Sequence, residues 1–471
     1  MNILDLLKSL LSLSLGDFIR RNFGTGPGTE LLIDVGGVFL LSTFCLLIVI
    51  FLIWLTRKLV ARMQDRIGPN RVGGRFGLLQ TVADVMKLLT KEVIHPSGAD
   101  WVAFNAAPIL VVIAALLMWA VMPFAPGVIG VDLNIGVFYI LAISSASVMV
   151  LLLAGWGSNN KYALLGAFRS VAQMVSYEVP MILALLVPII LASTMSTAGI
   201  IAAQGLPFIL FAPLSALIFY ISSLAETGRT PFDLLEAESE IVAGFHIEYS
   251  GMKFGMFFLA EFVNTLFMAG LFVTLYLGGY RFFGLENWVS ADGYPYGRLI
   301  GLVAFFAKVF FMYFVYDWIR GTLPRVRVDQ ILNFNWKFLV PVSLVLLFFT
   351  AIVDKLIPTG TNVVLRMAIH LTLNILIAAV TLELLRRRGR QNRLAMNGGD
   401  GPRGREPLHT EHHHHRHAGQ GGPSPDHRHP ESHSGPPRGA QALTAPLHSR
   451  RPQQATPRNH HETPRTLQLT R

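Results

Sequence analysis

Long apolar stretches recur along the chain and are separated by short polar segments. Nine of them have the length of a helix that crosses a hydrocarbon core of roughly 30 Å. They are residues 35–55, 104–124, 136–156, 175–191, 207–224, 254–280, 299–319, 338–353 and 363–385. The pattern predicts an all-α integral membrane protein, a bundle of about nine transmembrane helices with polar cytoplasmic loops. Pro180 and Pro188 are expected to break the fourth span.

Composition and charge agree with a polytopic membrane protein. The 471 residues are 52% hydrophobic and 14% charged. Lys and Arg gather in alternate loops, with 20 on one side and 6 on the other. Positive residues favour the cytoplasmic side, so the loop at 225–253 and the C-terminal tail are expected to face the cytoplasm of a bacterial plasma membrane. The excess of basic residues favours contact with anionic lipid over nucleic acid.

The composition divides the chain into three parts. Residues 1–30 are interpreted as an amphipathic N-terminal segment, residues 31–388 as the membrane domain, and residues 389–471 as a disordered tail that holds 12 of the 15 histidines. The HHHHRH run at 412–417 is typical of weak metal binding or of a tag, and no functional metal site is assigned. The single cysteine, Cys45, excludes an intrachain disulfide and is interpreted as packing.

The first polar segment, 57–92, predicts a surface helix. After a turn-rich link at 68–74, apolar residues recur at helical spacing from Leu78 to Leu89, opposite Asp84, Lys87 and Lys91. Such a helix lies along the membrane surface, where it anchors the chain in lipid or forms a gate for a hydrophobic ligand. The pattern leaves both interpretations open.

The second segment, 155–180, ends with Glu178 at the edge of an apolar run. A carboxylate in that setting costs about 2.5 to 3.5 kcal/mol on insertion scales, so it faces a partner, water or a polar cavity. Glu178 is therefore a proton-relay residue or an interfacial acid paired with Lys161 or Arg169.

The third segment, ETGRTPFDLLEAESEIVAGFHIE at 226–248, concentrates acids beside the bilayer. Thr230, Pro231 and Asp233 match the start of a short helix, on which Asp233 would share a face with Glu236 and Glu240. Crowded carboxylates are useful for passing protons and are equally natural on a solvated helix face. Glu261 and Lys308, inside later spans, would extend such a path.

The fourth segment, RGTLPRVRVDQ at 320–330, completes a set that resembles the H subunit of respiratory NADH:quinone oxidoreductase, complex I, a family that includes mitochondrial membrane subunit 1. Five motifs occur in the family's order within residues 30–388. They are RIGPNRVG, GLLQTVADVMKL, GWGSNNKYALLGAFRSVAQMVSYEVP, ETGRTPFDLLEAESEIVAGFHIEYSGMKF and PRVRVDQ. The resemblance implies a subunit that forms the entrance of the quinone chamber and joins the membrane arm to the peripheral redox arm.

Site residues follow from the resemblance residue by residue. It implies a quinone entrance and funnel at Arg57, Arg66, Asp84, Lys87, Arg229 and Phe232. It implies a proton relay of Glu178, Glu226, Asp233, Glu236, Glu238, Glu240, Glu248 and Glu261. Quinone would be a substrate, no cofactor would be covalently bound, and FMN and iron–sulfur clusters would belong to partner subunits. The chain carries no convincing dinucleotide fingerprint or Walker A motif, in keeping with NADH oxidation elsewhere.

The chain departs from the family pattern at three positions. Thr56 stands where many members have glutamate, Gly228 where asparagine is frequent, and Val328 where tyrosine is frequent. Three alternatives remain: the related subunit of a membrane-bound hydrogenase or other donor:quinone oxidoreductase, an independent ion transporter, and a purely structural anchor. Absence of an inverted repeat of the spans disfavours the transporter.

Overall fold

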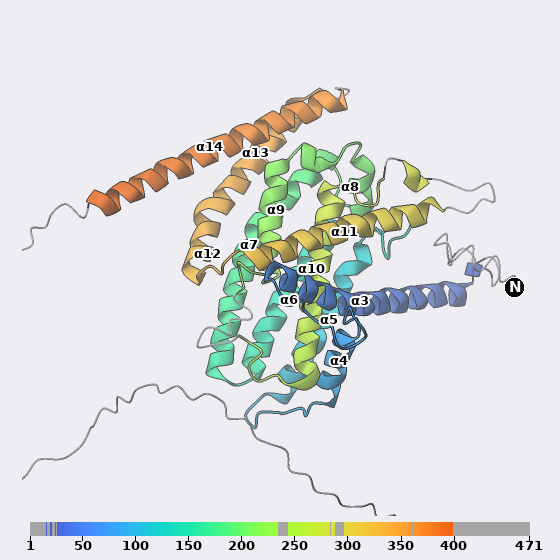
Figure 1. Ribbon diagram of the computed structural model, residues 1–471. Helices are drawn as coiled ribbons and strands as arrows, with labels where there is room; N and C mark the ends of the chain where they lie inside the picture. Colours follow the sequence, from blue (N-terminus) through green and yellow to red (C-terminus); the bar gives the residue numbers. More distant parts are fainter. Residues whose placement is uncertain are drawn as a thin grey trace, which may run out of the picture. The chain divides into compact units, whose positions relative to one another are not determined.

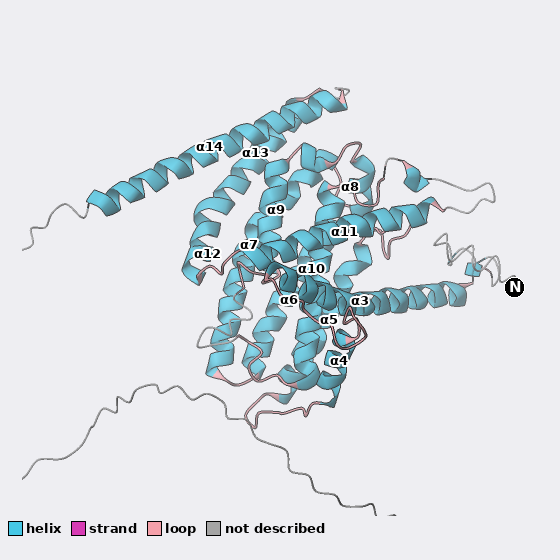
Figure 2. Cartoon of the chain, viewed as in Figure 1, coloured by secondary structure: helices cyan, strands magenta, loops and turns pink. Residues whose placement is uncertain are grey.

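In the part of the chain that the structure describes, eight helices are long and apolar enough to cross a membrane, so this is an all-α, multi-pass membrane protein (Figures 1 and 2). The computed structural model describes residues 16, 19–20, 24, 26–233, 244–282, 284–287, 296–358 and 362–398. The long helices are α3 (Pro27–Met63), α5 (Trp101–Met118), α6 (Gly136–Gly157), α7 (Lys161–Ala192), α10 (Gly251–Tyr276), α11 (Gly297–Thr322), α13 (Val340–Leu356) and α14 (Val363–Gly398).

Short elements complete the bundle. The helix η1 (Trp119–Val121) continues α5, and α12 (Val328–Phe334) with the π-helical turn η4 (Asn335–Leu339) runs directly into α13. The remaining elements are α4 (Gln80–Thr90), α8 (Thr197–Ala203), η2 (Phe208–Leu210), α9 (Pro213–Glu226) and η3 (Leu285–Asn287). Within the described ranges the one extended pairing is an isolated bridge between Ala125 and Val128.

The predicted fifth span is shorter than expected. Residues 207–224 form η2 and then α9, which has 14 residues and a length of about 21 Å. Pro213 occupies the start of α9, where its missing N–H does no harm, and it prevents one continuous helix from residue 207. The short helix is buried against α7, α10, α13 and α14.

The prolines do not break the fourth span, contrary to the prediction. Pro180 and Pro188 both lie inside the continuous helix α7. A proline lacks the N–H that would bond the carbonyl four residues earlier, so Pro180 releases the Ser176 carbonyl and Pro188 the Ala184 carbonyl. Both carbonyls accept bonds from other helices. Asn335 Nδ2 donates to Ser176 at 2.6 Å, while Ser215 Oγ and Tyr276 Oη donate to Ala184 at 2.8 and 2.9 Å.

Replacing Asn335 by leucine is expected to lower the thermal denaturation midpoint of the detergent-solubilised protein. It leaves the Ser176 carbonyl without its donor, at a cost of about 1 to 3 kcal/mol. Adding Pro180→Ala should recover most of the loss, because the new backbone amide bonds that carbonyl within α7. Asn333→Leu, in the same segment but exposed, is the matched control. Equal losses from both asparagine variants would contradict the account.

Helices α7 and α10 form the interior of the bundle. Of the eight long helices they are the most buried, and α10 contacts α3, α4, α5, α7, α8, α9 and α11. Cys45 is buried in the apolar core, as its interpretation as a packing residue requires. The N-terminal half of α3 extends past its neighbours (Figure 1) and exposes apolar side chains such as Leu31 and Phe39.

The predicted surface helix is α4, which contacts α3 and α10. Its apolar residues Leu79, Val82, Met86 and Leu89 are exposed, as expected of a face turned to lipid. At the other end of the chain, α14 continues to Gly398, past residue 389 where the tail was predicted to start. The sequence RQNRLAMN favours helix, which explains the extension. Most of the N-terminal segment and of the tail lies outside the described residues.

Candidate functional site

Three cavities are lined by five of the predicted site residues: Arg57, Arg66, Glu226, Glu248 and Glu261. The arginine cavity, about 360 Å³, is lined by Thr56, Arg57, Arg66, Phe258, Phe262 and Arg320 among others. The acidic cavity, about 90 Å³, is lined by residues that include Ser147, Glu226, His246, Phe258, Glu261 and Asn264. The loop cavity, about 820 Å³, is lined by Trp156, Asn160, Lys161 and Glu248 among others.

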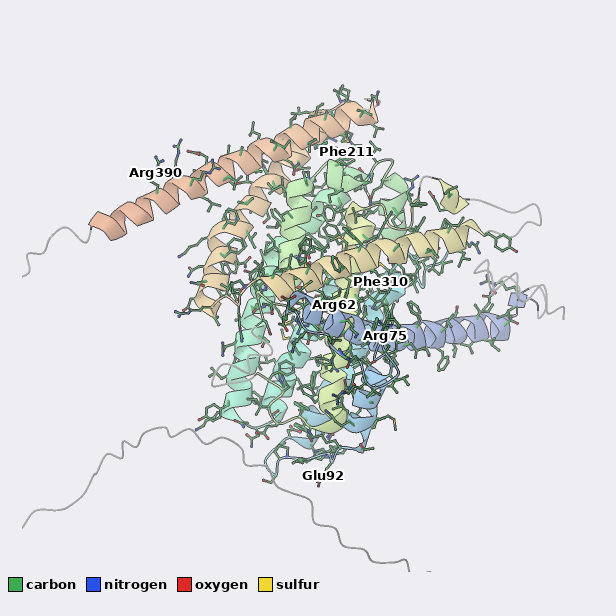
Figure 3. The ribbon with its side chains drawn as sticks, in the orientation of Figure 1. Arg62, Arg75, Glu92, Phe211, Phe310 and Arg390 are labelled. Carbon is green, nitrogen blue, oxygen red and sulfur yellow. The ribbon has the colours of Figure 1, made fainter. Side chains whose placement is uncertain are left out.

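The arginine cavity lies where α3 ends. The last turns of α3 supply Arg57, and the link that follows supplies Arg66. Figure 3 labels two further arginines of this region, Arg62 on the last turn of α3 and Arg75 on the link. The Arg57 guanidinium forms an ion pair with Asp84 of α4, so the surface helix is tied to the rim of the cavity.

Lys87, which was predicted with Arg57, Arg66 and Asp84 at the quinone entrance, lies on the same surface helix as Asp84. It is exposed and does not line the arginine cavity. Helix geometry explains this, because Asp84 points toward α3, whereas a residue three positions later is rotated by about 60° on the helix. The structure therefore brings Arg57, Arg66 and Asp84 together and leaves Lys87 outside the group.

A buried acid beside the arginine cavity escaped the sequence reasoning. Asp317 of α11 is 2% exposed, and its Oδ2 accepts a hydrogen bond from Thr56 Oγ1 at 2.7 Å. Tyr313 Oη lies 2.9 Å from the same Thr56 oxygen. In the sequence, Asp317 is a single acid three residues before Arg320, at the end of an apolar run. Only the packing of α11 on α3 reveals its partner.

Arg229 contacts residues of both the acidic cavity and the arginine cavity. This guanidinium is 2% exposed, lies 3.3 Å from a Glu261 carboxylate oxygen, and donates to Thr265 Oγ1 at 3.3 Å. Its central carbon is also 4.4 Å from the centre of the Phe262 ring, a cation–π distance. One buried cation therefore contacts an acid of one cavity and an aromatic ring of the other.

Helix α10 forms the wall between these cavities. Glu261 lines the acidic cavity, Phe262 lines the arginine cavity, and Phe258 lines both. Successive residues of a helix point about 100° apart, so two neighbours can face opposite sides of one wall. A change in the charge or position of a ligand in the arginine cavity can therefore reach Glu261 through Phe262 and Arg229.

Glu226 is the most buried acid of the acidic cavity. It ends α9, is 1% exposed, and accepts a hydrogen bond from Ser144 Oγ at 3.0 Å. Glu178 of α7 lies close enough for the two negative charges to interact, and it accepts a bond from Ser145 Oγ. That serine is the partner seen for Glu178, in place of the predicted Lys161 or Arg169. Adjacent serines of α6 thus hold two neighbouring carboxylates.

Glu248 lies apart from these acids. It lines the loop cavity and accepts a hydrogen bond from Asn160 Nδ2 at 2.6 Å, at the start of α7. The next residue, Tyr249, stacks on Phe104 with ring centres 4.2 Å apart, and burial raises the pKa of its phenol. Glu248 is therefore fixed near a loop, in a different cavity from Glu226 and Glu261.

The acidic loop is only partly described. Glu236, Glu238 and Glu240 lie outside the described residues, whereas Asp233 is half-buried and Phe232 is buried beside the ring of Tyr177. The predicted helix does not start at Pro231. Residues 230–233 form a turn with a cis Thr230–Pro231 bond, in which the Phe232 amide donates to the Arg229 carbonyl.

Two further expectations from the sequence concern Gly228 and Lys308. Gly228 has a φ of 62°, a left-handed conformation that glycine and asparagine adopt more readily than other residues, which accounts for the replacement of a frequent asparagine. The Lys308 ammonium donates to the carbonyls of Leu277, Gly279 and Arg281. It therefore closes the loop after α10, about 24 Å along the helix axis from Glu261, and does not extend the acidic path.

Among the described residues, no group of three or more His, Cys, Asp or Glu side chains could hold a metal ion.

The sequence pattern of the family described as NADH dehydrogenase matches residues 37–351 of this chain.

Curated relatives are similar over most of their length. The H subunit of NADH-quinone oxidoreductase from Dehalococcoides mccartyi is 47% identical over 69% of this chain and 88% of its own length. The protein of the same name from Bacteroides thetaiotaomicron is 43% identical over 67% of this chain and 88% of its own length. The one from Geobacillus kaustophilus is 47% identical over 63% of this chain and 86% of its own length.

Proposed function

Because the chain belongs to the NADH dehydrogenase family, we propose that it is the membrane subunit of a proton-pumping NADH:quinone oxidoreductase that forms the quinone entrance and an acidic relay. Its relatives are named as the H subunit of that oxidoreductase. Other subunits of the complex are then its partners, and they carry the FMN and iron–sulfur clusters. The chain supplies no redox centre. Its place is the bacterial plasma membrane, with the acidic loop and the tail on the cytoplasmic side.

The observation that carries this proposal is the shared wall of α10. Phe258 and Phe262 offer aromatic surface to a cavity of about 360 Å³, within the usual size range of ligand sites. Glu261 and Glu226 line a smaller cavity of about 90 Å³ on the other side, which is large enough for waters that carry protons. Arg229 contacts both sides.

The mechanism follows from this geometry. A quinone that has entered through the arginine cavity becomes more electron-rich when the partner subunits reduce it, and it takes up protons, which changes the field at Arg229 and Arg320. Arg229 is held by Glu261, so a change in its position or field alters the proton affinity of that acid and of Glu226. The acids would then release or accept protons toward the membrane arm. This chain therefore binds and orients the quinone and moves protons, while electron transfer belongs to partner subunits.

Mild detergent extraction of the chain from its native membranes tests the proposal. We expect recovery in a large assembly that contains iron–sulfur subunits and reduces quinone with NADH. Recovery of a large assembly that reduces quinone with hydrogen instead would support the hydrogenase-related alternative. A lone, redox-silent protein from gently treated membranes would contradict the proposal and favour an independent transporter.

Replacing Arg57 or Asp84 by leucine is expected to raise the KM for quinone about fivefold with little change in kcat, because the pair fixes the surface helix at the rim of the cavity. Both side chains are partly exposed, so assembly should be retained. Quinone titrations in membrane vesicles measure the effect. Arg387→Leu removes an exposed pair with Glu383 elsewhere and is the control. Unchanged quinone kinetics in both test variants would rule out an entrance at this rim.

A further inference from the structure

We propose that Asp317 positions the polar wall of the arginine cavity, acting through the hydroxyl of Thr56 and the guanidinium of Arg320. Asp317 does not line the cavity itself, whereas Thr56 and Arg320 do. It lies directly behind them on α11 and is 2% exposed. This inference rests on the proposed function of the arginine cavity as the quinone entrance.

The order of the hydrogen bonds shows what Asp317 does to Thr56. A hydroxyl has one proton to donate, and Thr56 donates it to Asp317 Oδ2 at 2.7 Å. The contact of 2.9 Å between Thr56 and Tyr313 must therefore use the phenol proton. The chain runs from Tyr313 to Thr56 to Asp317, so the carboxylate fixes the orientation of two buried hydroxyls. Without it, the Thr56 hydroxyl is free to turn toward the cavity.

Charge gives Asp317 a second role. Its negative charge interacts with Arg229 and Arg320, which lie on different segments of the chain. Arg57 is paired with Asp84 and Arg229 with Glu261. Asp317 therefore adds a third carboxylate to a region with four arginines, Arg66 and Arg320 included. A buried carboxylate is tolerated only with such hydrogen bonds and counter-charges. Asp317 and the polar residues of the cavity wall therefore stabilise one another.

The position of Thr56 explains why this acid comes from α11. The resemblance leads to a glutamate at position 56, and the chain has a threonine there. Since Thr56 contacts Asp317 directly, the facing helix supplies a carboxylate behind the wall position at which α3 lacks one. A simple structural acceptor for a buried hydroxyl would not need a charge, and this difference makes the inference testable.

The test uses the complete assembly in native membranes and a short-tailed, water-soluble quinone. NADH oxidation with hexacyanoferrate as acceptor counts the assembled complexes independently of quinone. We expect Asp317→Asn to raise the KM for quinone about fivefold while kcat changes less than about twofold. Asparagine keeps the size of the side chain and an acceptor for Thr56, so the change reports the charge.

A charge exchange separates positioning from simple packing. Thr56→Glu combined with Asp317→Leu moves the carboxylate from α11 to α3 and should return the KM to within about twofold of the parent protein. Thr56→Gln combined with Asp317→Leu has nearly the same volume without the charge, and it should keep a raised KM. If Asp317→Asn fails to assemble, the comparison of these two double variants decides the question.

The contrary results are distinct from one another. An unchanged KM for Asp317→Asn, or equal KM values for the two double variants, would overturn the role of Asp317. Failure of both double variants to assemble would also overturn it, because Asp317 would then be needed for folding whether or not position 56 carries a carboxylate. An unmodified assembly that fails to reduce quinone with NADH would instead refute the proposed function.

Discussion

Replacing Glu226 by glutamine is expected to reduce proton translocation about tenfold or more, the size of effect typical for loss of a proton-transfer group. Glu226 is 1% exposed and opens on the acidic cavity. Glutamine keeps the volume and can still accept from Ser144 Oγ, so folding is retained. What is lost is an ionisable group, which in the proposed relay takes up and releases a proton beside Glu178 and Glu261.

Acidification of inside-out vesicles during NADH oxidation measures this effect, expressed as protons moved per NADH oxidised. Glu286→Gln is the matched control, because Glu286 is also buried but accepts from the Phe282 amide and lies near Arg281. Its loss should leave the ratio unchanged. An unaltered ratio in the Glu226 variant would favour the chain as a structural anchor for the peripheral arm.

The sequence predicts the spans and the surface helix well because both depend on local patterns. Apolar runs define α3, α5, α6, α10 and α11, and helical spacing from Leu78 to Leu89 defines α4. The pattern fails at α7, where it predicts a break. The donors that keep α7 continuous, Asn335, Ser215 and Tyr276, are remote in sequence. No local rule connects them to Pro180 or Pro188.

The candidate site is predictable by residue type more than by geometry. An intramembrane acid such as Glu261 stands out in an apolar run, and the family motifs point to Arg57 and Asp84. Whether Glu261 and Phe262 face different cavities depends on the packing of α10, and the separation of Glu248 depends on the loop before it. Asp317 gains its meaning only from Thr56, which is 261 residues away along the chain.

Replacing Arg229 by glutamine is expected to lower the stability of the protein and abolish coupled turnover. The change removes the buried cation that Glu261 contacts, and breaking a buried pair in this way costs about 3 to 5 kcal/mol. That is a large part of the stability of a typical domain. Arg229→Lys should rescue poorly, because an ammonium cannot contact Glu261, Thr265 and the Phe262 ring at once.

A double variant separates the two losses. Arg229→Gln with Glu261→Gln removes both charges, so the thermal denaturation midpoint and the amount of assembled complex should recover toward the parent values. Proton translocation should stay low, because the link between the arginine cavity and the acidic cavity is still missing. Recovery of translocation together with stability would mean that the pair only supports the fold, and α10 would then be a wall between the cavities without a connection through it.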